Sequence, residues 1–104
     1  MAFELDHPHA LSDADARARL GALGEYLANK HGLTVRWVTE NEAKISGKYL
    51  VVTIDGTLTL SPGRARFTGK DPGMLWRGKA KDYLAGKLEK YLAPATALEA
   101  LPRR

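Results

Sequence analysis

The chain has 104 residues, of which 44% are hydrophobic and 27% charged, with a formal net charge of +4 and no cysteine. This balance is that of one small globular domain and excludes a largely disordered chain. The absence of cysteine excludes a disulfide framework, a thiolate metal site and a cysteine nucleophile.

The first predicted element is a short strand at the start of the chain. Phe3 and Leu5 alternate with acidic residues, which is the period of a half-buried strand. Pro8 lacks a backbone amide donor, so we expect this strand to stop near His7 or to lie at the edge of a sheet.

A helix follows, predicted from Asp13 to His31. Ser12 is a favourable N-cap, and acidic residues in the first turn suit the positive end of the helix dipole. Apolar residues recur at helical spacing and form one face of this helix. Gly32 is typical of a left-handed C-cap that ends the helix.

Residues 34–68 change to a period of two, which predicts several strands. The polar residues 40–42 predict a turn, and residues 49–54 are rich in strand-forming side chains. Asp55-Gly56 is typical of a two-residue hairpin turn, because such a turn needs positive φ angles. We therefore expect a strand on each side of that dipeptide.

The last strands are predicted between residues 57 and 68. Leu58 and Leu60 alternate with threonines, and residues 61–63 predict a turn or a bulge. Residues 64–68 alternate again, either as a further strand or as a continuation past a kink. The sequence therefore leaves open whether the sheet has four or five strands.

Helical spacing returns at Met74. Apolar and aromatic residues line one side of this second predicted helix, and Pro94 ends it near Ala93. We expect residues 95–104 to form a flexible tail, which leaves residues 1–94 as a single α+β domain.

The order of elements predicts an α+β two-layer sandwich. Short connections favour an antiparallel β-sheet of four to five strands, with two helices on one face (β-α-β-β-β(-β)-α). The residues expected to be buried in its core are Leu20, Leu23, Leu27, Trp37, Ile45, Val52, Ile54, Leu58, Leu84 and Leu88.

Positive charge is concentrated in the second half of the chain. The net charge is −1 over residues 1–52 and +5 over residues 53–104. Aromatic residues interleave with lysines on the second helix, which is typical either of core aromatics with solvated lysine stems or of a surface for an anionic partner. The basic surface predicted as a binding site comprises Arg64, Arg66, Arg77, Lys79, Lys81, Lys87 and Lys90.

Other patterns point only weakly to chemistry. His7 and His9 would project the same way from an extended strand, but no third ligand has a spacing that completes a metal site. Residues 69–79 (GKDPGMLWRGK) lack the spacing of a phosphate-binding loop, and the serines lack the surroundings of a nucleophile. We therefore expect no metal, no cofactor and no enzymatic activity.

The sequence favours a cytoplasmic protein without a membrane span. No apolar run approaches the ~20 residues that a spanning helix needs. The first residues lack the basic region and the apolar stretch of a signal peptide.

Short motifs around the first helix resemble those of a known family. His9-Ala10-Leu11-Ser12 precedes the helix, Ala16-Arg17 lies in it, and His31-Gly32-Leu33 leads to a strand with Arg36-Trp37. Over residues 3–92, this order of motifs, strands and charged helix is similar to the polyhydroxyalkanoic acid system family proteins. That family is named for the gene context of polyester storage granules. The resemblance implies a role near such granules or in their regulation, and no reaction.

Two hypotheses on function follow. The first is a non-enzymatic accessory protein that acts by surface binding, with another protein or a polyester granule as its partner. The second is a small basic module that binds nucleic acid. They differ in their salt response, because phosphate binding weakens steeply as salt rises whereas apolar adsorption does not.

Overall fold

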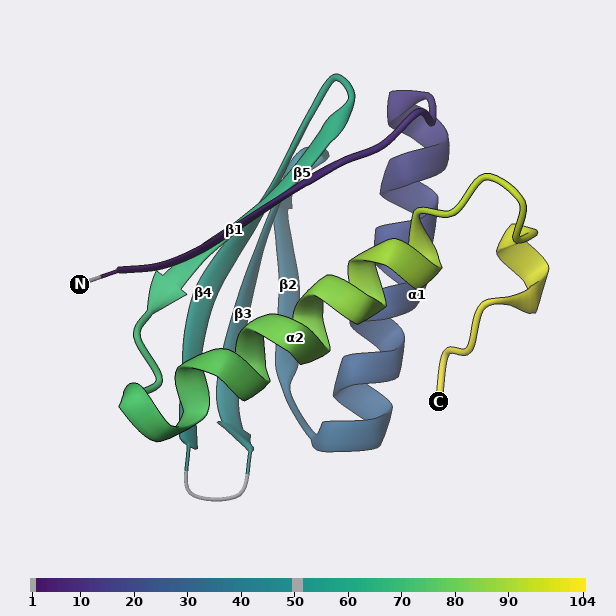
Figure 1. Cartoon of the computed structure of the whole chain (residues 1–104). Coiled ribbons are helices and arrows are strands. Elements are labelled where there is room, and N and C mark those ends of the chain that lie inside the picture. Colours follow the sequence, from purple (N-terminus) through teal and green to yellow (C-terminus); the bar gives the residue numbers. More distant parts are fainter. Residues whose placement is uncertain (1, 50–51) are drawn as a thin grey trace.

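The computed structural model describes residues 2–49 and 52–104. Its elements are β1 (Ala2–Pro8), α1 (Asp13–His31), β2 (Thr34–Thr39), β3 (Glu42–Tyr49), β4 (Val52–Ser61), β5 (Arg64–Lys70), α2 (Met74–Tyr91) and the short 3-10 helix η1 (Leu98–Ala100). The strands form one antiparallel sheet in the order β1-β5-β4-β3-β2. Both α-helices lie on the same side of the sheet (Figure 1). The predicted α+β sandwich is confirmed, with five strands.

One face of the sheet forms one side of the hydrophobic core. The register places Leu5, Phe67, Leu58, Ala43 and Trp37 in a single row that crosses all five strands. Every second residue of each strand faces this side, because side chains alternate across a strand. The buried stripe of α1 covers the row with Ala16, Leu20, Leu23 and Leu27.

The predicted core is largely confirmed. Seven of its ten residues are buried, and Trp37, Ile54 and Leu84 are partly buried and packed against the rest. Trp37 lies on the edge strand β2, where the guanidinium of Arg17 is 3.5 Å from the centre of its ring. Ile54 and Leu84 border an open cleft that is described below.

The ends of the first two elements agree with their predictions. β1 is an edge strand and ends at Pro8. The Ser12 hydroxyl accepts a hydrogen bond from the amide of Asp15, 3.2 Å away, as an N-cap does. Gly32 has a φ of 69° and donates its amide to the carbonyl of Ala28, which ends α1 as predicted.

The predicted turn at Asp55-Gly56 is wrong. Both residues lie inside β4, where Gly56 is the register partner of Ile45 on one side and of Gly69 on the other. A Cβ on Gly56 would lie 2.3 Å from Cζ of Phe67. Glycine is therefore needed here to make room for an aromatic ring and not to reverse the chain. Tyr49 and Val52 are register partners at the other end of the β3–β4 pair, so the Asp55-Gly56 dipeptide lies within the paired strands.

The C-terminal residues fold back onto α1. Leu101 is 4% exposed and belongs to the core. The hydroxyl of Tyr91 donates to the carbonyl of Pro102, and the side-chain amide of Asn29 donates to the carbonyl of Arg103 at 2.8 Å. The flexibility expected for residues 95–104 concerns motion and stays a prediction.

Candidate functional site

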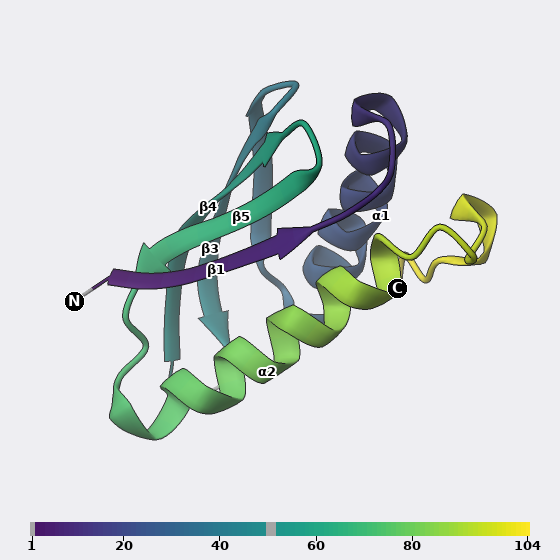
Figure 2. The ribbon, with the colours of Figure 1, turned by 45° about the horizontal axis from the view of Figure 1, so that its top comes forward.

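The second helix is packed against the fold at only one end. Leu88 and Tyr91 are fully buried, whereas no residue from Met74 to Lys87 is. Figure 2 shows the C-terminal end of α2 beside α1 and its N-terminal end at the loop that follows β5. The first half of α2 is therefore the part of the described chain with the least packing support.

Two large apolar side chains on the first turn of α2 face solvent. Met74 is 85% exposed and Leu75 is 86% exposed. Asp71 holds this end of the helix, since its carboxylate accepts from the amide of Gly73 and from the guanidinium of Arg77. These bonds to the charged form lower the pKa of Asp71, and the hydrogen bond from Arg77 is the largest cause.

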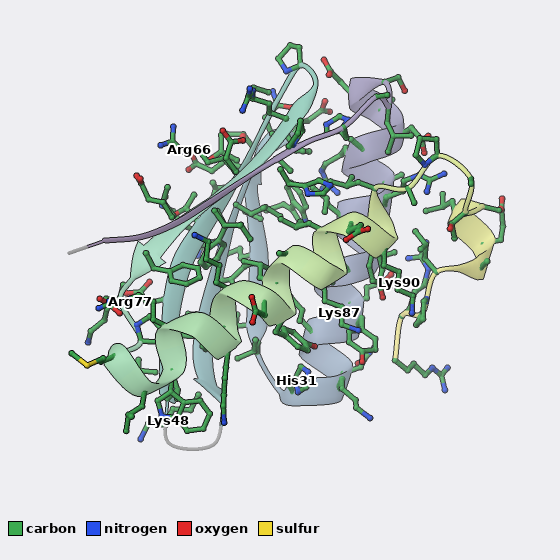
Figure 3. All side chains as sticks on the ribbon, in the orientation of Figure 1. His31, Lys48, Arg66, Arg77, Lys87 and Lys90 are labelled. Carbon is green, nitrogen blue, oxygen red and sulfur yellow. The ribbon has the colours of Figure 1, made fainter. Side chains whose placement is uncertain are left out.

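The seven residues predicted as a basic surface are divided between two sides of the protein. Arg64 and Arg66 alternate in β5 with the buried Ala65 and Phe67, so they face solvent on the side of the sheet away from the helices. Figure 3 shows Arg66 at the sheet, while Arg77, Lys87 and Lys90 follow α2. The seven side chains therefore do not form one continuous surface, and the binding role predicted for them stays a prediction.

The two arginines of β5 are paired with acidic residues of the neighbouring strand. Arg64 lies 2.6 Å from a carboxylate oxygen of Asp6, and Arg66 lies 3.3 Å from one of Glu4. These pairs cross the β1–β5 ladder on its solvent side. They neutralise the positive charge that the sequence had suggested for this strand.

Lysines of α2 lie beside aromatic rings instead. The Nζ atom of Lys79 is 5.5 Å from the ring centre of Trp76. Lys87 Nζ is 4.4 Å from the ring centre of Tyr26 and 5.5 Å from that of Tyr83. Trp76 and Tyr83 are only partly covered, whereas Tyr91 is fully buried. Of the two interpretations of this helix, core packing therefore holds for Tyr91 and a partly exposed surface holds for the other two.

An apolar cleft of about 470 Å³ lies between the first half of α2 and the sheet. Phe3, Ile45, Ile54 and Phe67 belong to its sheet side. Trp76, Ala80 and Leu84 of α2 form the opposite wall. Ala80 and Leu84 are only partly buried on this wall, and full burial of α2 begins at Leu88.

A hydrogen bond closes one end of the cleft. Nε2 of His31, at the end of α1, is 2.8 Å from the hydroxyl of Tyr83 on α2. Burial lowers the pKa of His31 below its ordinary value of 6.5, and the charges of Lys30 and Lys87 lower it further. The neutral imidazole is therefore favoured in the folded protein.

The lowered pKa predicts a pH dependence of stability. As pH falls through 6.5, the unfolded chain takes up a proton at His31 before the folded one does, so the free energy of unfolding should decrease. Urea denaturation at about pH 7.5 and about pH 5.5 should show a larger decrease for the wild type than for His31→Gln. The control variant His7→Gln should retain the wild-type decrease. Equal decreases in the wild type and His31→Gln would contradict this account.

Of the other two histidines, His9 has a structural role in the backbone before α1. Nδ1 of His9 accepts from the amide of Leu11 at 3.1 Å, which holds the imidazole in the turn before α1. Its Nε2 is buried without a hydrogen-bond partner among the described residues. Within residues 2–49 and 52–104, no group of three or more histidine and acidic side chains is placed to hold a metal ion.

Sequence reasoning missed both the cleft and the exposed apolar turn of α2. Trp76, Ala80, Tyr83 and Leu84 have the spacing of an ordinary buried stripe, and that spacing does not reveal how closely a helix approaches the sheet. The available signal was the glycine and lysine content of the first half of α2, which is unusual for a helix that packs along its whole length.

Comparison with known proteins gives one result. The model of a family described as putative polyhydroxyalkanoic acid system protein matches residues 3–95. No curated protein and no solved structure matches the chain. The matched range ends before η1, so it includes both α-helices and the whole sheet. No helix in the described part of the chain is long and apolar enough to cross a membrane.

Proposed function

The chain belongs to the polyhydroxyalkanoic acid system protein family, and from this membership we propose that it is a non-enzymatic accessory protein that binds the surface of polyhydroxyalkanoate granules. The first turn of α2 would make the contact. The proposal keeps the cytoplasmic location that the sequence favours.

One observation carries the proposal, namely the exposure of Met74 and Leu75 at 85% and 86%. Exposed apolar side chains of this size mark interaction sites when they are grouped and fringed by polar residues. Here the exposed Lys79 and Lys81 follow within two turns, and neither forms an ion pair with a described residue. Exposed apolar side chains next to basic ones suit an apolar surface that carries negative charge. The apolar atoms would be removed from water on binding, and the cations would lie beside the negative charges of the surface.

Nucleic-acid binding is supported less well by the same geometry. The arginines of β5 are paired with Asp6 and Glu4, and Arg77 is paired with Asp71. A phosphate backbone would have to compete for each of these cations. The sedimentation experiment therefore includes DNA as a comparison.

The double substitution Met74→Ser with Leu75→Ser should abolish most of the association with granules. Each side chain offers about 1.5–3 kcal/mol of apolar burial, so their joint loss should weaken binding at least about tenfold. Co-sedimentation of the purified protein with isolated granules, at low and high salt, measures this loss. Retention of the wild type should persist at high salt.

Val38→Ser is the matched control, because Val38 is also exposed and apolar but lies on the edge strand β2. It should sediment with granules as the wild type does. All three proteins should melt alike, since substitutions at exposed positions usually change stability by about 0.5 kcal/mol. Equal retention of the wild type and the Met74/Leu75 variant would contradict the proposal. Retention on DNA alone, lost at high salt, would favour the nucleic-acid hypothesis.

A further inference from the structure

We propose that the cleft under α2 binds an aliphatic chain that ends in a carboxylate. A hydroxyalkanoic acid with a long alkyl side chain has this chemistry, and so does the terminal unit of its polymer, whose side chain is the part that would enter the cleft. The biological source of the ligand rests on the proposed function, whereas the binding chemistry rests on the cleft itself.

The size and lining of the cleft fit an apolar chain. Its volume of about 470 Å³ lies within the range of about 300–1,000 Å³ that is typical of small-molecule sites. Aliphatic and aromatic side chains supply both walls, and the largest are Phe3, Phe67 and Trp76. A ligand with hydrogen-bonding groups along its length would lose water contacts there without replacement, so the buried part of the ligand must be apolar.

Polar residues lie at the borders of the cleft. Lys70, Lys79 and Asp55 are exposed residues that line it, but alternation along β4 and β5 turns the side chains of Asp55 and Lys70 toward the other face of the sheet. His31 and Tyr83 also border it, and they bind each other. The cation at the border is therefore Lys79 of α2, whose Nζ is 5.5 Å from the ring centre of Trp76, and it favours an anionic end group over a cationic one.

Lys79 differs from many other cations of the protein because it is available to a ligand. Arg19, Lys44, Arg64, Arg66, Arg77 and Arg103 each form an ion pair. Lys79 forms none with any residue that the structure describes. A carboxylate at the mouth of the cleft could accept from the ammonium group of Lys79, and charge-assisted hydrogen bonds of this kind are the stronger ones.

The protein contains its own reporter for this test. Trp76 lines the cleft and Trp37 is the other of the two tryptophans. In a Trp37→Phe background, the emission of Trp76 should shift to shorter wavelength and saturate as decanoate is added below its micelle concentration. Decan-1-ol should bind more weakly, and decyltrimethylammonium more weakly still.

Two sets of variants test the site. Ala80→Leu should fill the cleft and remove the saturable shift, whereas Ala85→Leu, on the same helix but outside the lining, should leave it unchanged. Lys79→Gln should weaken decanoate binding by about twofold to fivefold and leave decan-1-ol binding unchanged, whereas Lys70→Gln, on the other face of the sheet, should leave both unchanged. Calorimetric titration of Lys79→Gln gives an answer even if Ala80→Leu does not fold.

Several results would overturn the inference. One is the absence of a saturable shift with decanoate, and another is equal binding of decanoate and decyltrimethylammonium. A third is binding that survives Ala80→Leu in a folded protein. An ester-linked dimer of 3-hydroxydecanoate, compared with the free acid, identifies the source, because tighter binding of the dimer indicates a polymer end and tighter binding of the acid indicates a free ligand.

The inference and the proposed function can fail separately. If the protein binds decanoate but does not sediment with granules, the inference on the cleft holds and the proposed granule binding is wrong. If it sediments with granules through Met74 and Leu75 but does not bind decanoate, the granule proposal holds and the inference on the cleft is wrong.

Discussion

Gly56→Ala should lower the free energy of unfolding by about 2–3 kcal/mol, the upper part of the range for ordinary overpacking. The added Cβ would lie 2.3 Å from Cζ of Phe67 and 2.8 Å and 3.0 Å from its Cε atoms. The ring is 8% exposed and its centre is 5.9 Å from that of Phe3 in an edge-to-face contact, so it has to give up this packing and shift toward the cleft that it lines. Urea denaturation followed by circular dichroism measures the loss.

Two further variants make this result specific. Phe67→Leu is destabilising by itself, but its cost should be smaller in the Gly56→Ala background than in the wild type, because the clash is then gone. Gly78→Ala is the matched control, since a Cβ there meets nothing within 4 Å on an exposed helix position. It should stabilise the protein by about 0.5–1 kcal/mol. Gly56→Ala unfolding at the wild-type urea concentration would contradict the packing role of this glycine.

The role of Gly56 shows which parts of the fold could be predicted from the sequence and which could not. Both helix ends of α1, the edge position of β1 and the single apolar face of the sheet follow from neighbours in sequence, through caps and alternation. Gly56 is different, because its reason is a ring on β5 that reaches it only through strand pairing. An Asp-Gly dipeptide satisfies the local rule for a turn equally well, so the sequence alone could not separate the two roles.

The candidate site was predictable only in its residue types. Interleaved aromatics and lysines on α2 did indicate a surface with exposed cations. The prediction that Arg64 and Arg66 share that surface is wrong. In β5 these side chains point away from α2, and the sequence alone does not show which face of the strand the helix covers. The cleft itself depends on how α2 lies over the sheet, and the buried anchors of this helix, Leu88 and Tyr91, join a core whose other members are far away in sequence.

Arg19→Ala should also cost about 2–4 kcal/mol, because it removes hydrogen bonds from a charged donor and leaves buried carbonyls without a partner. The Arg19 side chain is 6% exposed, and its Nε is 2.9 Å from a carboxylate oxygen of Asp15. Its Nη1 donates to the carbonyl of Ala93 at 2.9 Å and to that of Tyr91 at 3.4 Å. The guanidinium thereby satisfies carbonyls at the C-terminal end of α2, where cations are also favoured by the helix dipole.

Arg17→Ala, two residues earlier on the same helix, is the control. Its guanidinium stacks on Trp37 at the sheet edge, and losing that contact should cost about 1 kcal/mol. Equal losses of unfolding free energy in the two variants would contradict a special role for Arg19.

Amide hydrogen exchange adds a local test, because Arg19→Ala should speed exchange throughout α2 more than in the sheet. Since α2 is held mainly at its C-terminal end, freeing that end removes one wall of the cleft, and the variant should lose decanoate binding together with the protection of α2.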